Sequence, residues 1–302
     1  VLMQAKAPTA CSVWFLTLGA QVVRSREEVA PSPGHSGSWG MARAARIETM
    51  LPQQCVDGEV ALTFHRHRSL NEPETVIRSA SVFVPRLVIA SPLARDDIVH
   101  GGEVHFVTGG TGGLGMLTGR WLAQRGRHAV TLASRSGKVA SDVAAEWDAL
   151  RASGAAVRLE RCDTSEPMHV HRAMARMPSL GGVWHAAGVL LDAVLAQQDA
   201  DALAGSYAPK AHGAWSLHGT SATAEVHAFA LFSSGAALMG NAGQANYSAA
   251  NACLDALASC RKLRGDAAVS VEWGAWSEIG MASRGTANSR ILAMEASMGI
   301  GR

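Results

Sequence analysis

The sequence is poor in aromatic residues and has no long apolar run. Only 5% of its 302 residues are aromatic, and just two are tyrosines, Tyr207 and Tyr247. A reaction that needs a phenolic acid therefore has only two candidates. No apolar stretch reaches the roughly 18 residues that a membrane-spanning helix needs. The net charge of +2 gives no basic surface of the kind that binds nucleic acid.

Cysteine is also scarce, and its spacing excludes two classes of small stabilised domain. The five cysteines are an odd number without a C-x-x-C pair, which argues against a zinc knuckle, any related metal site and a disulfide framework. We expect reduced, buried thiols. The cysteines are Cys11, Cys55, Cys162, Cys253 and Cys260.

The N-terminal segment allows two interpretations. Residues 10–20, with Lys6 before them, could form the apolar core of a signal peptide. The run Val13–Thr17 fits a buried strand equally well. The sequence begins at Val1, as an excised piece of a longer polypeptide would. The expected location is cytoplasmic, with a plastid as the alternative.

The pattern changes near residue 98. Before it come a Pro/Gly/Ser stretch at 31–40, a short helical piece at 41–50, and strand-like runs at 59–65 and 81–88. After it, strands and helices alternate, which predicts an α/β fold with a doubly wound, Rossmann-like parallel sheet. The expected strands are Val104–Thr108, His128–Ala133, Ala156–Arg161, Gly182–His185, Ala228–Ser233 and Ala268–Trp273.

The most informative motif follows the first of these strands. Gly110, Gly112 and Gly115 satisfy G-x-G-x-x-G between a strand and a helical pattern at 116–124. Such glycines permit a tight turn, close approach to a pyrophosphate and a helix N-terminus aimed at the negative charge. A glycine-rich turn can also simply join a strand to a helix. The required order of strand, turn and helix favours dinucleotide binding.

The end of the second strand indicates which dinucleotide is bound. An NAD site places an acid there, on the ribose 2′-hydroxyl. This sequence has Ser134 and Arg135 instead, and a guanidinium suits a 2′-phosphate. NADPH is therefore the expected cofactor, and a solvated surface arginine is the alternative.

Ligands of such sheets lie beyond the carboxyl ends of the strands. Cys162 and Asp163 follow the third strand, where the carboxylate can accept from an adenine amino group or cap the turn beginning at Ser165. The small residues of the segment 185–188 follow the fourth strand and would let backbone lie against a cofactor.

A candidate acid follows the fifth strand. Tyr247 and Asn251 are four residues apart on a predicted helix, so both face the same way. A free phenol has a pKa of about 10 and is a weak acid near neutrality unless a cation stabilises its anion. Lys210 on the preceding helix is the candidate cation, although spacing alone favours a solvated lysine. We treat the Tyr207-x-x-Lys210 spacing as coincidental.

Several of these segments occur in a family-specific order. They are Thr108–Gly115, His185–Asp192, Pro209-Lys210 and Leu231–Asn251. Together they resemble the β-ketoacyl reductase domain of type I polyketide and animal-type fatty acid synthases, within the short-chain dehydrogenase superfamily. Segments 14–20, 37–43 and 84–88 are similar to that family's structural subdomain. The resemblance implies a truncated, degenerate Rossmann-like structural subdomain at 1–98 and a catalytic NADPH-binding subdomain at 99–302.

The resemblance also implies roles for individual residues. Tyr247 would donate a proton, Ser234 would bond the same oxygen, Lys210 would lower the phenol's pKa and hold the ribose, and Asn251 would orient Lys210 or a relay water. Trp273, Gly274 and Met281 would close over the nicotinamide. The expected cofactor-binding residues are Thr108, Gly109, Gly110, Thr111, Gly112, Gly113, Leu114, Gly115, Ser134, Arg135, Cys162, Asp163, His185, Ala186, Ala187, Gly188, Trp273 and Gly274.

The function implied is NADPH-dependent reduction of a β-ketoacyl thioester to the β-hydroxyacyl thioester. The substrate would be tethered through phosphopantetheine to an acyl carrier protein, within a multidomain synthase. The alternative is a catalytically silent scaffold that binds the cofactor. In the loop after the fourth strand only Asp192 remains of the Leu-Asp-Asp typical of reductases that give D-hydroxyl products, and Met239 stands where the opposite class has tryptophan. This favours a D-hydroxyl product, with a surface or capping role for Asp192 as the alternative.

Overall fold

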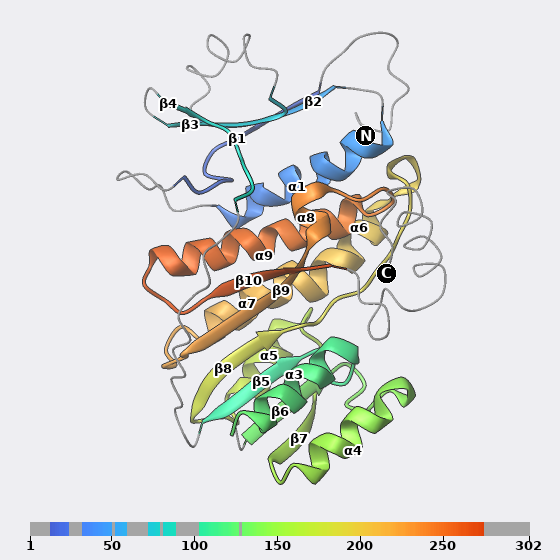
Figure 1. The fold of residues 1–302 in the computed structure, drawn as a ribbon, viewed down its shortest axis with the longest axis vertical. Coiled ribbons are helices and arrows are strands. Elements are labelled where there is room, and N and C mark those ends of the chain that lie inside the picture. Colours follow the sequence, from blue (N-terminus) through green and yellow to red (C-terminus); the bar gives the residue numbers. More distant parts are fainter. Residues whose placement is uncertain are drawn as a thin grey trace. The chain divides into compact units, whose positions relative to one another are not determined.

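The computed structural model describes residues 13–23, 32–49, 52–58, 72–78, 81–88, 103–126 and 129–274. These residues cluster into two compact units (Figure 1). The first unit contains the described residues up to 88, together with 191–207 and 233–272, and the second contains the described residues among 103–190, together with 208–232, 273 and 274. The two later segments of the first unit, 191–207 and 233–272, cluster with the N-terminal residues. The functional division expected at residue 98 stays a prediction.

The first unit contains a four-stranded sheet in the order β1-β2-β3-β4. The first three strands are parallel, and the last pair is antiparallel. Trp39, Cys55 and Val76 form part of the core beneath this sheet. The strands are β1 (Val13–Thr17), β2 (Gln53–Asp57), β3 (Glu74–Arg78) and β4 (Ser81–Phe83).

The helices of the first unit include one that begins earlier than the sequence pattern predicted. A short helical piece was expected at 41–50, whereas helix α1 begins at Pro33, inside the Pro/Gly/Ser stretch, and continues to Glu48. Proline is well tolerated in the first turn of a helix, and neighbouring packing overrides the low helix propensity of glycine. The other helices are α6 (Ala200–Tyr207), α8 (Gly235–Met239) and α9 (Ala245–Leu263), and strand β10 (Val269–Trp273) follows α9.

The second unit is built on parallel strands in the order β9-β8-β5-β6-β7. Each of the strands expected after residue 98 is present, with bounds that agree to within two residues. The last two residues of β9 cluster with the first unit. The strands are β5 (Val104–Thr108), β6 (Ala129–Ser134), β7 (Ala156–Arg161), β8 (Leu180–His185) and β9 (Ala228–Ser234).

The strand order reverses beside β5, because the chain runs from β5 outward to β7 and then returns to β8. Right-handed crossovers on either side of such a reversal place helices on opposite faces of the sheet. Val107, Met116, Leu132 and Leu150 are core residues between the sheet and the first helix pair. The helices are α3 (Gly113–Gln124), α4 (Ala144–Ala152), α5 (Pro167–Met174) and α7 (Gly213–Thr220), and a π-helical turn, η4 (Ala208–His212), precedes α7.

The N-terminal expectations had mixed outcomes. Residues 13–17 form a strand, as one interpretation predicted, but Trp14 and Leu16 are 38% and 41% exposed, so the strand is only half buried. In the run at 81–88 only the first three residues are a strand, and the run at 59–65 lies outside the described residues. Strands β2 and β3 were not predicted.

Two expectations drawn from scarce features were also tested. Four of the cysteines are free and buried, as predicted, and Cys11 lies outside the described residues. None of the helices in the described part of the chain has the length and apolar character needed to cross a membrane.

Candidate active site

The turn after β5 has a backbone that only glycine accommodates at two positions. Gly109 has a φ of +66°, and a Cβ there would lie 2.7 Å from the carbonyl oxygen of Ala186. A Cβ on Gly115 would lie 2.2 Å from the carbonyl oxygen of Gly109. Helix α3 begins directly after this turn, with Gly112 as its N-cap. The glycine pattern therefore produces a compact turn that presents a helix N-terminus.

A cavity of about 230 Å³ opens beside this turn. It lies where the ends of β5 and β8 meet at the reversal of strand order, which is where doubly wound sheets bind their ligands. Most of the predicted cofactor-binding residues line it. The lining consists of Gly109, Thr111, Gly112, Gly113, Leu114, Gly115, Ser134, Arg135, Cys162, Asp163, Thr164, Ala186, Ala187, Gly188, Val189 and Pro209.

Five predicted cofactor-binding residues are not part of this lining. Thr108 and His185 are fully buried and bond one another, with 2.7 Å between the Thr108 hydroxyl and His185 Nδ1. Gly110 packs against Leu132. The ring of Trp273 lies against Phe232, and Gly274 is exposed at the end of the described chain. Met281, the third residue of the expected lid, lies outside the described residues.

Some polar residues of the cavity already form hydrogen bonds within the protein, whereas the Arg135 side chain is exposed to solvent. The Arg135 side chain is exposed and makes no ion pair among the described residues. Ser134 accepts a hydrogen bond from the backbone amide of Gly137 at 3.1 Å. Asp163 accepts from the amide of Ser165 at 3.0 Å, so its carboxylate caps that turn while also lining the cavity.

Lys210 lies in the π-helical turn of the second unit and is only 2% exposed. Its ammonium donates to the carbonyl oxygen of Phe232 at 2.8 Å, and His185 Nε2 bonds its backbone carbonyl at 2.9 Å. A Cβ on Gly188 would lie 2.7 Å from Lys210 Cε, so the chain after β8 passes directly against the lysine side chain. π-Helical turns are rare and often occur at functional sites. Lys210 is therefore a held, buried cation and not the solvated lysine that spacing favoured.

Ser234, Tyr247 and Asn251 come together in the first unit. Ser234 is the N-cap of α8, where its hydroxyl accepts from the amide of Ala236 at 3.2 Å. Tyr247 and Asn251 lie one turn apart on α9, and Asn251 Nδ2 donates to the carbonyl oxygen of Tyr247 at 2.8 Å. Asn251 Oδ1 is buried and has no hydrogen-bond partner among the described residues.

The pKa of Tyr247 is raised, not lowered as the sequence argument expected. Burial raises the pKa of this phenol to about 12, hydrogen bonds from Asn251 and Ser234 lower it, and the negative charge of Asp192 raises it. Desolvation outweighs the lowering groups because the side chain is 9% exposed. Tyr247 therefore keeps its proton at neutral pH. Burial also raises the pKa of the other tyrosine, Tyr207, whose hydroxyl accepts from the Cys253 thiol at 3.6 Å.

Residues around Tyr247 that the sequence argument passed over also hold its position. Asn246 is fully buried; its Oδ1 accepts from the amide of Tyr247 at 2.7 Å, and its Nδ2 donates to the carbonyl oxygen of Leu191 at 2.9 Å. Gln244 Nε2 donates to both carboxylate oxygens of Asp192, at 3.2 and 3.3 Å. The sequence does show an asparagine, Asn246, directly before Tyr247. Its role could not be predicted because the sequence does not show that this side chain is buried.

Comparisons with known proteins agree with this geometry. The family model of the KR domain matches residues 103–278. Polyketide synthase GfsA of Streptomyces halstedii is 38% identical over 297 residues, which cover 92% of this chain and 4% of that protein. The phthioceranic/hydroxyphthioceranic acid synthase of Mycobacterium tuberculosis (strain ATCC 25618 / H37Rv) is 34% identical over 257 residues, covering 80% of this chain and 12% of the synthase. The chain thus spans a small part of the length of these relatives.

Solved structures give the same result. The structure of A-type ketoreductases from a modular polyketide synthase has a TM-score of 0.84 at 33% identity, covering 93% of this chain and 62% of that one. The first ketoreductase of the tylosin polyketide synthase has a TM-score of 0.78 at 30% identity, covering 95% and 67%. The fold is therefore the Rossmann type expected of short-chain reductases. The chain belongs to the KR family, the ketoreductase domains of polyketide synthases.

Proposed function

We propose that this chain uses NADPH to reduce a β-ketoacyl thioester to the β-hydroxyacyl thioester. The observation that carries the proposal is the arrangement around Tyr247, whose protonated phenol lies with Ser234 and Asn251 beside it. A general acid of this kind must hold its proton at working pH and lie among groups that stabilise its anion once the proton has left. Family membership supports an oxidoreductase.

The cavity of the second unit fits a pyridine dinucleotide. Its floor is the glycine turn and the N-terminus of α3, whose free amides suit a pyrophosphate. Asp163 lies in the lining, where its carboxylate would accept from an adenine amino group in addition to the amide of Ser165. Arg135 supplies an exposed guanidinium for a 2′-phosphate. These residues would hold NADPH, which when bound supplies a hydride to a ketone carbon.

The residues of the chain would manage the charge that this reduction creates. Negative charge develops on the carbonyl oxygen, and Tyr247 would transfer its proton to that atom. The Ser234 hydroxyl would donate a hydrogen bond to the same oxygen, as donors in oxyanion sites do. Lys210 would hold the nicotinamide ribose, because its ammonium is fixed by Phe232 and lies at Gly188 in the cavity wall. The unpartnered Oδ1 of Asn251 would accept from a relay water.

The substrate would arrive on an acyl carrier protein, tethered through phosphopantetheine, with the chain acting as one domain of a multidomain synthase. The lengths of the relatives support this setting, because each is a synthase many times longer than this chain. Cytoplasmic location and D-hydroxyl configuration stay predictions. Chiral analysis of a reduced β-ketoacyl thioester tests the last of these, and Asp192 is the residue on which it depends.

The test is turnover of a simple β-ketoacyl thioester, followed as NADPH oxidation, with NADPH binding measured separately by fluorescence. We expect the chain to turn over and Tyr247→Phe to lose about a hundredfold or more in turnover, a loss within the range for removing a general acid. Tyr207→Phe is the matched control, since it removes the other phenol. Binding of NADPH without turnover by the unaltered chain would favour a silent scaffold. Near-normal activity of Tyr247→Phe would remove this residue from the mechanism.

Cofactor choice has its own test. Arg135→Ala should weaken the preference for NADPH over NADH by about tenfold or more, because a charge-assisted hydrogen bond to phosphate is worth roughly 1.5–3 kcal/mol. Arg151→Ala removes an exposed arginine from α4, outside the cavity lining, and serves as the control. An unchanged preference in Arg135→Ala would leave this arginine as a surface residue.

A further inference from the structure

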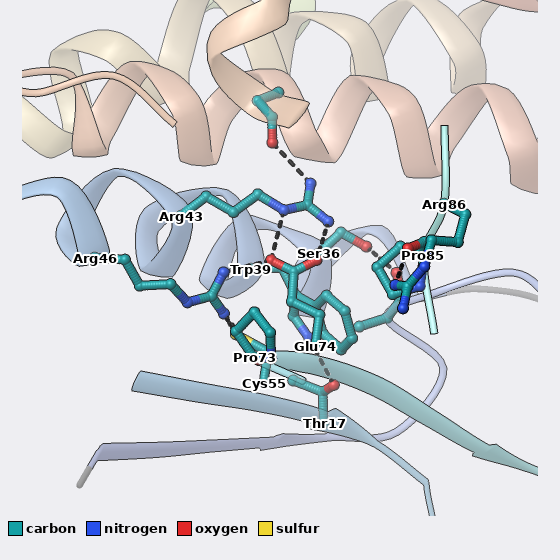
Figure 2. Close-up of polar contacts among 12 residues, drawn as sticks. Thr17, Ser36, Trp39, Arg43, Arg46, Cys55, Pro73, Glu74, Pro85 and Arg86 are labelled. Carbon is teal, nitrogen blue, oxygen red and sulfur yellow. Dashed lines mark hydrogen bonds and ion pairs between the residues drawn. The ribbon is translucent and has the colours of Figure 1, made fainter. Parts of the chain in front are cut away.

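Arg43 on helix α1 joins the N-terminal sheet to helix α8 (Figure 2). Its Nε and Nη2 donate to the two carboxylate oxygens of Glu74 on β3, at 2.8 and 2.7 Å. Its remaining nitrogen, Nη1, donates to the carbonyl oxygen of Ala237 at 2.7 Å. Glu74 and Arg43 have side chains only 7% and 13% exposed. The guanidinium is thus oriented by a buried carboxylate and holds a backbone atom of α8.

Helix α8 is short enough for this contact to matter. It spans five residues, its N-cap is Ser234, and the last carbonyls of any helix lack partners within the helix. A cation at the carbonyl end satisfies one of them and is favoured by the helix dipole. Gly240, just beyond the helix, has a φ of +79°, and a Cβ there would lie 2.4 Å from the carbonyl oxygen of Arg43. Helix α8 therefore has Ser234 at one end and is fixed to α1 at the other.

Glu48 makes an equivalent contact with the loop before α9. It is the last residue of α1, where a negative charge is disfavoured by the helix dipole. Its carboxylate instead accepts from two backbone amides, Gly243 at 2.7 Å and Leu195 at 2.5 Å. The same two loops also bond one another, through the amide of Ala193 and the carbonyl oxygen of Gly243 at 3.0 Å. Glu48 thus bridges the loop that follows Asp192 and the loop that begins the helix of Tyr247.

An apolar contact lies along the same face of α1. Ala44 and Ala45 form one buried cluster with Leu195 and Ala245, the first residue of α9. The two polar contacts therefore flank a packed apolar surface. The two segments held against this face of α1 are α8 and the first turn of α9. Ser234 is the N-cap of α8, Tyr247 lies in the first turn of α9, and the proposed function gives both residues a part in the reaction.

We infer that Arg43 and Glu48 are positioning residues, which fix the backbone segments that carry Ser234 and Tyr247. The inference rests on the proposed function for its kinetic consequences. Reacting groups must be held to within about 0.5 Å of the productive geometry, and a displacement of about 1 Å can cost up to a hundredfold in rate. The predicted structural subdomain would then influence the reaction rate through the side chains of Arg43 and Glu48, in addition to stabilising the fold.

Arg46 provides a matched control for Arg43. It lies on the same helix and also bonds Glu74, at 2.6 Å. Its other contacts are the carbonyl oxygens of Gln53 and Pro73 and the sulfur of Cys55, none of which lies on α8. Arg43→Met and Arg46→Met each remove one guanidinium from Glu74, so both should lower the urea midpoint to a similar extent. Only Arg43→Met should lower kcat, by about tenfold. The KM for NADPH should not change in either variant.

The kinetic comparison is decisive in both directions. Equal kcat losses in the two methionine variants, measured on fully folded protein, would reduce Arg43 to a stabilising role and overturn the inference. If Arg43→Met fails to fold, Arg43→Lys takes its place. A single ammonium cannot bond both Glu74 and the Ala237 carbonyl in the fork geometry of arginine, so an intermediate kcat is expected, and an unchanged kcat would contradict the inference.

Glu48→Gln tests the second contact without relying on activity. One amide oxygen can accept from one backbone N–H, whereas the NH₂ group would face the other, so one hydrogen bond is lost. Hydrogen exchange at Leu195 or Gly243, read by mass spectrometry of short peptides, should become about tenfold faster or more. Glu146→Gln, which removes a carboxylate paired with Arg120, should leave both sites unchanged. Unaltered exchange in Glu48→Gln would overturn the bridge.

The two readouts separate failure of this inference from failure of the proposed function. If the unaltered chain reduces no β-ketoacyl thioester, the proposed function fails, while the exchange at Leu195 and Gly243 still decides whether Glu48 fixes these loops. If the chain is active and Glu48→Gln exchanges faster, kcat in that variant should fall with no change in the KM for NADPH. An unchanged kcat there would show that the loops need no such positioning.

Discussion

Two glycine-rich segments of this chain, residues 109–115 with five glycines and residues 34–40 with three, have different structures. The first is the turn after β5, where Gly109 has positive φ and the backbone lines a cavity. The second is part of α1, where the glycines are helical. A Cβ on Gly40 would lie 2.3 Å from the carbonyl oxygen of Ser248 on α9. Glycine serves close approach in both segments, toward a ligand cavity in one and toward a helix in the other.

The difference lies in what surrounds the glycines. The first segment follows an apolar strand and precedes an amphipathic helix, so the sequence around it specifies a turn. The second follows Pro31, Ser32 and Pro33, which look like a linker. Its helical state depends on packing against α9, two hundred residues later in the chain. Composition alone therefore does not distinguish a glycine turn from a glycine-lined helix contact.

The largest effect is expected at the first segment, from Gly115→Ala. The added Cβ would lie 2.2 Å from the carbonyl oxygen of Gly109, and this atom is backbone and cannot rotate away. We expect NADPH affinity to fall by about tenfold to a hundredfold, because overpacking of this kind costs roughly 1–3 kcal/mol. Gly112→Ala is the control, since the nearest atom to its Cβ is 3.4 Å away. Titration of NADPH fluorescence measures both, and equal affinities would show that the turn is not specific for glycine.

The two units should also differ in how their stability depends on pH. Burial and the charge of Lys210 lower the pKa of His185 to about 4, against a slight raising by its bond to the Lys210 carbonyl. The unfolded chain, with a histidine pKa of about 6.5, then binds more protons between these values. The neutral, buried His185 therefore contributes fully to the free energy of unfolding above pH 6.5, and this contribution is lost as the pH falls toward 4. It amounts to about 3 kcal/mol, at 1.36 kcal/mol for each pKa unit.

The first unit should respond to acid at lower pH. Burial opposes ionisation of Glu74, but its bonds to Arg43 and Arg46 prevail and its pKa is lowered. The ionised Glu74 carboxylate therefore contributes to the free energy of unfolding at pH values above the usual pKa of a glutamate. This contribution is lost only as the pH falls below that pKa. Amide protection factors, which correct hydrogen exchange for its intrinsic dependence on pH, should fall between pH 6.5 and 5 in peptides of β5 and β8 and not in those of β3. His185→Gln should remove this pH dependence, and a variant that keeps the same slope would assign it to another group.

The parallel sheet and the lining of the cavity beside the glycine turn were predictable because their signals are local. Each strand is a short apolar run, and the residues that line the cavity follow those runs directly. Arg135 was identified in this way, from one residue that replaces an expected acid. Family resemblance supplied Lys210, which spacing alone had dismissed as solvated.

The rest of the site depends on contacts that no local pattern contains. The bonds of Glu48 to Leu195 and Gly243 span about half the chain or more in sequence, and those of Arg43 reach α8 from α1. The raised pKa of Tyr247 follows from burial, which the spacing of Tyr247 and Asn251 does not reveal. Strands β2 and β3 were missed because Gln53, Glu74 and Arg78 interrupt their apolar pattern. Those polar residues are held by partners that come from other elements.

The smallest effects should come from two substitutions within α1 itself. Gly40→Ala places a Cβ 2.3 Å from the Ser248 carbonyl oxygen, and relief requires α1 and α9 to separate. Overpacking costs about 1–3 kcal/mol, while replacing helical glycine by alanine returns up to about 1 kcal/mol, so the free energy of unfolding should fall by about 1–2 kcal/mol. Gly34→Ala meets no atom within 4 Å and has only the favourable part, so it should stabilise by at most about 1 kcal/mol.

Urea unfolding of the two variants gives the sign of each change, and NADPH affinity should be unaltered in both, since neither glycine belongs to the cavity lining. Opposite signs would establish that Gly40 is selected for helix contact and not for chain flexibility. If Gly40→Ala were as stable as Gly34→Ala, the close approach of α1 to α9 would be dispensable. The glycines of residues 34–40 would then have no demonstrated role in packing, in contrast to the glycines that form the turn at 109–115.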